Sequence, residues 1–148
     1  MGLIHIIGGE VMRKSEIVAE FTSDIQKVWN IVTNNEDYKW RSDLERIEIS
    51  DKGRTFIEYT KNGFQTKFII TKKIECSRYE FKMENKRLTG YWTGLFYQTE
   101  TGGTKIIFTE HIYINNPIIE VLSYLFMNLK KIQVTYVNDL RKKLGEQI

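Results

Sequence analysis

A long amphipathic segment near the C-terminus constrains the fold of this chain more than any other feature. Asn116 can cap a helix, Pro117 is tolerated in a first helical turn, and Gly145 can terminate the helix. The pattern predicts a helix over 117–144, about 42 Å long, whose apolar stripe must lie across another layer of structure. The stripe consists of Ile118, Leu122, Leu125, Leu129, Ile132, Tyr136, Leu140 and Leu144.

The rest of the chain predicts one strand, a short helical region and then a succession of strands. Alternation over 15–21 predicts the first strand, and Ser23 with Gln26 has the spacing of a capping box for a helix over 24–33. A second short helical stretch is expected around 36–40. Turn sequences such as Lys61-Asn62-Gly63 predict antiparallel hairpins, and therefore an α+β fold with a sheet of about seven strands. The later strands are expected at 44–50, 54–61, 64–74, 78–84, 88–99 and 104–114.

Composition excludes several classes of function. The chain has 148 residues, 41% of them hydrophobic, which suits one domain with a real core. Its net charge of +3 is scattered, so no nucleic-acid partner is expected. One cysteine and two histidines favour neither a disulfide nor a Cys/His zinc site, and no motif indicates a cofactor. Because no apolar run is long enough to span a bilayer, we expect no stable membrane insertion and a cytoplasmic location.

The N-terminus has an unusual feature. Residues 7–12 can be back-translated into a purine-rich stretch just before an ATG codon, as in a ribosome-binding site. The hypothesis is that the biological start is Met12 and that residues 1–11 are an upstream extension; the alternative is an ordinary N-terminal strand or arm. We therefore expect a single domain over 14–148, preceded by an extension over 1–13.

The order of elements resembles a known superfamily. The segments SEIVAEFTSDIQKVWNIVTNNEDYKW and TGYWTGLFYQTETGGTKIIFTE, with the long terminal helix, are similar to the START/Bet v 1-like (SRPBCC) superfamily, in particular its polyketide cyclase/dehydrase-like branch. The resemblance implies a helix-grip fold, in which a bent antiparallel sheet wraps the C-terminal helix and encloses a cavity for an apolar ligand. The branch shares no catalytic motif, so no catalytic residue is transferred from it.

Alternation along the strands indicates which residues face such a cavity. Thr66 and Tyr59 are the polar groups expected inside, where their hydroxyls either orient a ligand or bond to nearby backbone. Trp40 is expected either at the wall or mouth of the cavity or in the core. Gly90 and Gly94, on the Trp92 face, leave space for either a bend in the sheet or a ligand. The expected ligand-binding residues are Trp40, Tyr59, Thr66, Phe68, Phe81, Trp92, Phe108, Glu110, Leu122, Leu125 and Leu129.

Glu110 is the most unusual of these residues. A period of two that turns Phe108 and Ile112 inward also turns Glu110 inward, while His111 points out. A carboxyl group in an apolar pocket has a raised pKa, which suits a general acid or base. The alternatives are that Glu110 is exposed to solvent, or that it pairs with Arg46 or Arg41.

Three functions are compatible with these patterns. The first is binding or transport of a small hydrophobic or aromatic, lipid- or polyketide-like molecule. The second is a polyketide cyclase/dehydrase-type enzyme in which Glu110 moves protons, with Tyr59 as a possible partner. The third is a protein-interaction module or a homodimer formed through the C-terminal helix, because apolar residues lie outside its main stripe. Those residues are Ile119, Val121, Tyr124, Phe126 and Met127.

Overall fold

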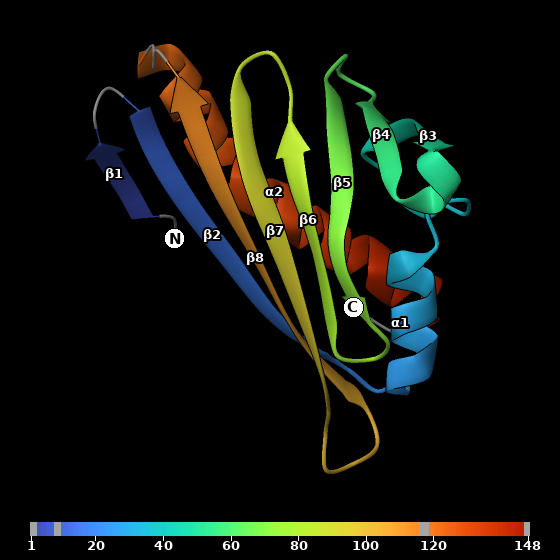
Figure 1. Cartoon of the computed structure of the whole chain (residues 1–148). Coiled ribbons are helices and arrows are strands. Elements are labelled where there is room, and N and C mark those ends of the chain that lie inside the picture. Colours follow the sequence, from blue (N-terminus) through green and yellow to red (C-terminus); the bar gives the residue numbers. More distant parts are fainter. Residues whose placement is uncertain (1–2, 8–9, 116–118, 147–148) are drawn as a thin grey trace.

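One curved antiparallel sheet and a long helix make up most of the computed structural model (Figure 1). The structure describes residues 3–7, 10–115 and 119–146, and the side chains within 12–114 and 129–146. In these ranges the sheet has eight strands and the chain two α-helices. The strands are β1 (Leu3–Ile7), β2 (Glu10–Phe21), β3 (Leu44–Ser50), β4 (Thr55–Thr60), β5 (Gln65–Ile74), β6 (Arg78–Glu84), β7 (Leu88–Gln98) and β8 (Thr104–Asn115); the helices are α1 (Ile25–Thr33) and α2 (Ile119–Lys143).

The strand order is β1-β2-β8-β7-β6-β5-β4-β3. Strands β3 to β8 each pair with their neighbour in sequence, and β8 closes the order by pairing with β2. The seven expected strands are all present, and β1 adds a further strand at the edge, where it pairs with the start of β2. The expected hairpin turns are also present, with Gly63 and Gly102 at positive φ, a conformation that costs glycine little.

Helix α1 begins one residue later than the capping-box prediction. Its N-cap is Asp24, whose carboxylate accepts a hydrogen bond from the Lys27 N–H at 2.9 Å. Ser23 instead donates from its hydroxyl to Glu146, so the predicted cap is wrong. Residues 36–40 form turns rather than the second short helix that we expected. The buried face of α1 packs through Trp29, whose ring centroid lies 4.9 Å from that of Phe96.

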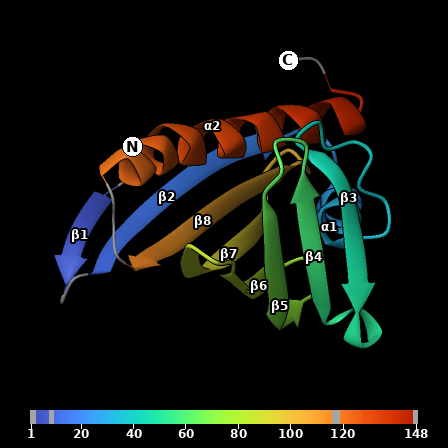
Figure 2. The ribbon, with the colours of Figure 1, turned by 90° about the horizontal axis from the view of Figure 1, so that it is seen from above.

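Helix α2 lies along the concave face of the sheet (Figure 2). Gly145, at a φ of +77°, ends the helix as predicted. Its buried side chains, among those described, are Leu129, Gln133, Val137, Asp139 and Leu140, and Leu144 is buried just beyond the end of the helix. Ile132 is 45% exposed although it lines the cavity described below, so the predicted stripe faces the sheet at that position without being fully buried. Gln133 is buried because its amide exchanges hydrogen bonds with Ser15, accepting from the Ser15 hydroxyl at 2.7 Å and donating to the Ser15 carbonyl at 3.1 Å.

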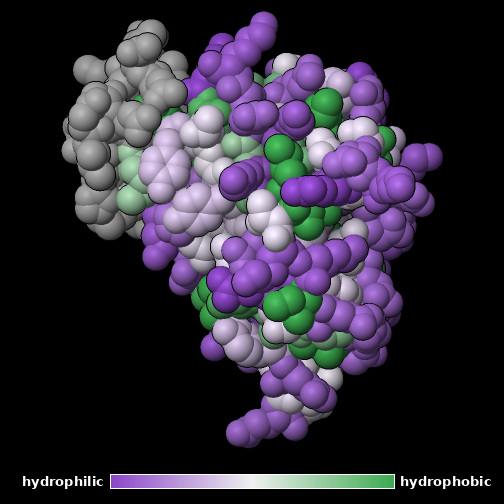
Figure 3. Space-filling view, in the orientation of Figure 1, coloured by the Kyte–Doolittle hydropathy of each residue, from purple (hydrophilic) through white to green (hydrophobic). Residues whose placement is uncertain are grey.

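The two faces of the sheet differ in character. The convex face, viewed in Figure 3, is largely hydrophilic with scattered apolar side chains. His111 points to this face, as predicted, and stacks on Tyr91 with ring centroids 4.4 Å apart. The concave face carries the hydrophobic core, which therefore lies between the sheet and the two helices. The arrangement is α+β, as the residue patterns predict, and it is the helix-grip architecture that the resemblance implies.

Candidate functional site

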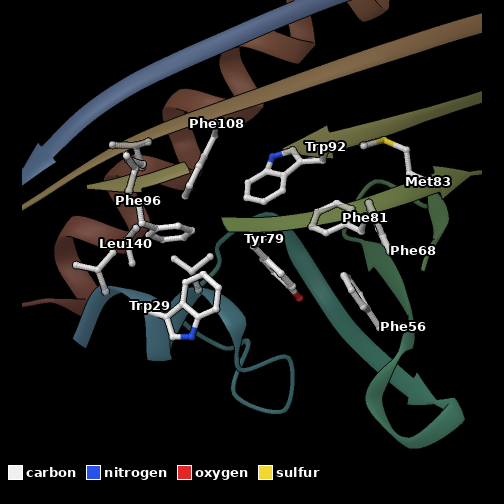
Figure 4. Close-up of a cluster of buried hydrophobic side chains, with 14 of the residues drawn as sticks. Trp29, Phe56, Phe68, Tyr79, Phe81, Met83, Trp92, Phe96, Phe108 and Leu140 are labelled. Carbon is white, nitrogen blue, oxygen red and sulfur yellow. The ribbon is translucent and has the colours of Figure 1, made fainter. Parts of the chain in front are cut away.

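A cavity of about 430 Å³ lies between the concave face of the sheet and α2. Five aromatic side chains from five adjacent strands form a continuous row along its wall (Figure 4). Successive ring centroids are 4.7 to 5.1 Å apart, and the Phe81 and Trp92 rings are stacked with their planes 3° apart. The row runs Phe108 (β8), Trp92 (β7), Phe81 (β6), Phe68 (β5) and Phe56 (β4).

Gly94 explains how this row is accommodated. A Cβ atom at position 94 would lie 2.4 Å from Cη2 of the Trp92 indole, so the indole lies where a side chain would otherwise be. At Gly90, an added Cβ would lie 2.3 Å from the His111 carbonyl oxygen, which marks a close approach of β7 to β8. Gly94 therefore makes room for Trp92 itself, and Gly90 for the neighbouring backbone.

A charged cluster lies at another part of the cavity wall. The Arg41 guanidinium donates to Glu58 at 2.8 Å and to Asp43 at 3.0 Å. Its central carbon lies 4.9 Å from the centre of the Tyr136 ring. Burial alone would lower the pKa of Arg41, but Glu58 and Asp43 outweigh burial and the pKa is raised. Arg41 is therefore a permanent cation that neutralises one of its two carboxylate partners.

The loop that carries Arg41 is tied to α2. Asp139, which is buried on α2, accepts hydrogen bonds from the Ser42 N–H at 2.7 Å and the Ser42 hydroxyl at 2.8 Å. The neighbouring Tyr136 packs edge-on against Trp40 from the same loop, with ring centroids 5.2 Å apart. Burial raises the pKa of the Tyr136 phenol. These contacts fix the position of the guanidinium relative to the helix.

Glu110 faces the cavity from β8. Its cross-strand partners are Ser15 on β2 and Trp92 on β7, whose side chains point to the same face of the sheet. Its carboxyl group has no hydrogen-bond partner among the described residues. Burial, and secondarily the nearby Glu58 carboxylate, raises the pKa of Glu110 to about 7, while Arg41 partly offsets the rise. Near neutral pH, Glu110 can therefore hold or release a proton inside the cavity.

Seven of the eleven predicted ligand-binding residues line the cavity. Leu122 and Leu125 lie outside the residues whose side chains are described. Trp40 contacts Tyr136 rather than the cavity, and its indole N–H donates to the Asp37 carbonyl at 3.0 Å. The seven are Thr66, Phe68, Phe81, Trp92, Phe108, Glu110 and Leu129.

The prediction for Tyr59 is wrong. Its hydroxyl donates to Glu48 at 3.2 Å, and the Arg46 guanidinium carbon lies 3.7 Å from its ring centre. Phe56 and Glu58 of the same strand line the cavity instead, since they pair with Phe68 and Thr66. Arg46 is therefore engaged with Tyr59 and Glu48, and it is not the partner suggested for Glu110.

Sequence reasoning missed Glu58, Phe56 and Tyr136 as cavity residues, and it considered Arg41 only as a partner for Glu110. A signal for the first two was present in the hairpin turn Lys61-Asn62-Gly63. A hairpin centred on residue 62 pairs 58 with 66 and 56 with 68, and paired residues share a face. Arg41 comes from a loop without periodicity, so no pattern in the sequence places it.

The exposed residues that line the cavity mark where it opens to solvent. Lys61 and Asn62 lie in the turn between β4 and β5, and Arg87 lies in the turn between β6 and β7. The Arg87 guanidinium carbon lies 5.5 Å from the centre of the Phe64 ring. The cavity thus has an aromatic and acidic interior with a basic rim.

Two further observations concern only the part of the chain that the structure describes. Within it, no helix is long and apolar enough to cross a membrane. Within the same part, His, Cys, Asp and Glu side chains do not gather in threes or more as a metal site requires. The apolar residues suggested for a dimer or partner interface, Ile119, Val121, Tyr124, Phe126 and Met127, have side chains outside the described range.

The architecture is a helix-grip arrangement, which is consistent with a Bet v 1-like fold. Solved structures share this fold at low sequence identity. An uncharacterised protein from Bacillus thuringiensis superposes with a TM-score of 0.73 at 14% identity, over 90% of this chain and 99% of that one. XoxI from Bacillus cereus superposes with a TM-score of 0.69 at 14% identity, over 88% of this chain and 94% of XoxI.

A third similar structure is of a protein from a named biosynthetic pathway. StfQ, a di-domain ARO/CYC protein from the steffimycin biosynthetic pathway, has a TM-score of 0.71 at 12% identity. The match covers 90% of this chain and 52% of StfQ, so this chain spans about half the length of that protein. No family model matches the sequence, and no curated protein matches it. The comparisons therefore show the fold alone.

Proposed function

We propose that this protein binds a small hydrophobic or aromatic molecule, of lipid- or polyketide-like character, between its sheet and its C-terminal helix. The observation that carries the proposal is the cavity of about 430 Å³ with its row of five aromatic rings. Ligand pockets typically have volumes of roughly 300–1,000 Å³ and are mostly apolar with a few polar groups. We assign the function to a single domain over 14–148 of a cytoplasmic protein.

Desolvation supplies the affinity in this proposal. Burial of apolar surface contributes about 25 cal/mol per Å², so a ligand burying about 300 Å² gains about 7.5 kcal/mol. Ordering the ligand and the side chains that contact it offsets part of this gain. The flat rings of Phe81 and Trp92 favour planar or extended apolar ligands. Thr66 and Glu110 provide hydrogen-bonding groups that set the ligand's orientation.

The test combines native mass spectrometry with a titration. Protein purified without refolding is examined for a bound small molecule, and binding of the neutral fluorophore N-phenyl-1-naphthylamine is measured. Thr66→Trp places an indole inside the cavity, whereas Thr71→Trp places one at an exposed position of the same strand. We expect saturable binding that Thr66→Trp weakens by about tenfold or more and Thr71→Trp leaves unchanged. Absence of both a bound molecule and saturable probe binding would refute the function.

A second candidate is a polyketide cyclase/dehydrase-type enzyme. It is favoured by Glu110, whose pKa of about 7 inside the cavity suits a general acid or base, and by the fold shared with StfQ. Tyr59 plays no part in such a mechanism because it bonds to Glu48 away from the cavity. For this candidate we expect Glu110→Gln to abolish turnover of a polyketide substrate analogue while N-phenyl-1-naphthylamine still binds. Turnover that persists in this variant would exclude Glu110 as the proton-transfer group.

A further inference from the structure

We propose that the cavity selects a ligand that carries one protonated amine, held between the carboxyl groups of Glu58 and Glu110 and against the neighbouring aromatic rings. The inference rests on the proposed binding function and adds to it the charge of the ligand. It follows from the balance of charges in the cavity wall, from the position of Glu110 and from the chemistry of the surrounding rings.

The interior of the cavity has more acidic groups than basic ones. Asp43, Glu58 and Glu110 line it, and Arg41 is the one basic side chain that the structure describes away from the rim. Arg41 donates to Asp43 and Glu58 together, so these three groups carry a net charge of −1. Ionisation of Glu110 adds a second negative charge that no described side chain neutralises by a hydrogen bond or an ion pair.

Glu58 dominates the electrostatic environment of Glu110. Burial raises the pKa of Glu110 most, and the Glu58 carboxylate raises it further by more than the Arg41 guanidinium lowers it. From the position of Glu110, the Arg41–Glu58 pair therefore behaves as a net negative charge. A cation between Glu58 and Glu110 would remove this repulsion and allow Glu110 to ionise.

The rings around these carboxyl groups suit an organic cation. Tyr79, Trp92, Phe108 and Tyr136 all line the cavity, and aromatic faces attract ammonium groups within about 6 Å. A metal ion fits less well, because the described His, Cys, Asp and Glu side chains form no group of three that could hold one. An acidic ligand is disfavoured, since the guanidinium of Arg41 already serves two carboxylates.

Other charged groups face the site from several elements. Arg41 and Asp43 from the loop before β3, Glu58 from β4, Tyr79 from β6 and Tyr136 from α2 line the same cavity. Of these groups, Glu58 and Arg41 shift the pKa of Glu110. Lys61 and Arg87 lie at the solvent-exposed rim. Arg13 on β2 also points to the concave face, but it does not shift the pKa of Glu110.

Three probes of nearly equal shape test the inference. They are 2-naphthylmethylamine, 2-naphthalenemethanol and 2-naphthoic acid, with binding measured by equilibrium dialysis and naphthalene fluorescence. At about pH 8 we expect the amine to bind about tenfold or more tightly than the alcohol, and the acid to bind most weakly. The amine remains protonated down to about pH 6 while Glu110 takes up a proton, so its affinity should fall about tenfold over that range.

A charge-removing variant completes the test. Glu110→Gln should remove the preference for the amine and leave the alcohol's affinity within about threefold. Glu84→Gln, the same change at an exposed position of β6, should leave all three affinities unchanged. Alcohol binding as tight as amine binding, or an amine preference that survives Glu110→Gln, would overturn the inference and leave the binding function standing. Failure of all three probes and of N-phenyl-1-naphthylamine to bind would overturn both.

Discussion

The stability of this protein should depend on pH through Glu110, and Glu110→Gln isolates that dependence. Burial and the neighbouring Glu58 raise the pKa of Glu110 in the folded state from 4.5 to about 7. In the unfolded chain the carboxyl group is exposed to water and titrates near its ordinary pKa. Glutamine has nearly the shape of a protonated glutamate but cannot ionise, so the variant keeps the packing and loses only the titration.

The sign of the effect follows from proton binding. Between about pH 4.5 and pH 7 the folded state keeps the Glu110 proton that the unfolded state releases, so unfolding releases protons. The free energy of unfolding of the wild-type protein therefore falls as pH rises through this window and levels off above it. The two pKa values differ by about 2.5, and at 1.36 kcal/mol for each pKa unit the contribution amounts to about 3 kcal/mol.

Urea unfolding followed by circular dichroism at about pH 5 and about pH 8 measures this quantity. Wild type and Glu110→Gln should differ little at the lower pH, and the variant should be more stable by about 3 kcal/mol at the higher pH. Glu84→Gln serves as the control, because Glu84 is exposed on β6 and should show no such divergence. A wild-type to Glu110→Gln difference that is equal at both pH values would refute the assignment of a cavity-facing, proton-holding Glu110.

Three other changes test the contacts around the cavity. Arg41→Met leaves Glu58 and Asp43 without their shared cation, so the free energy of unfolding in urea should fall by about 3–5 kcal/mol at about pH 8. This loss should shrink on acidification. A loss of stability that is independent of pH would contradict the pairing. Gly94→Ala should lower the free energy of unfolding by about 1–3 kcal/mol and shift the tryptophan fluorescence, because the new methyl group overlaps the Trp92 indole. An unchanged fluorescence spectrum would refute that packing. Asp24→Ala should lower the free energy of unfolding by about 1 kcal/mol, and with it the melting temperature, because Asp24 caps α1. If Ser23 capped the helix instead, the substitution would leave the melting temperature unchanged.

Alternation and turn chemistry predicted most of the sheet and one important site residue. On β8, apolar residues occupy every second position from Ile106 to Ile114 except one, so Glu110 was placed inward, as the structure has it. Strand β6, and β5 as far as Ile70, were oriented correctly for the same reason, since their charged residues occupy only the outer face. After Ile70 a register shift places Lys73 opposite the inward-facing Tyr79, which alternation did not predict. The long helix was predicted because its cap-like residues and apolar period agree.

The same reasoning failed where both faces of a strand carry apolar residues. On β4, Phe56 lies on one face and Ile57 and Tyr59 on the other, so hydrophobicity alone favours the wrong face. The register with β5 decides the question by placing Phe56 opposite Phe68. On α2, the polar Gln133 is buried beside the cavity-lining Ile132, because Ser15, 118 residues away in sequence, satisfies its amide.

The sequence by itself determined the strands, the helices and the inward direction of Glu110, because these depend on local periods and turn residues. Only the tertiary structure placed Arg41 between Glu58 and Asp43 and brought Glu58 to the same cavity as Glu110. Those contacts join the loop before β3 with strands β4 and β8, which are not neighbours in the sheet. They depend on how strongly the sheet curves around α2. Curvature arises from contacts across the whole fold, so no short stretch of residues encodes it.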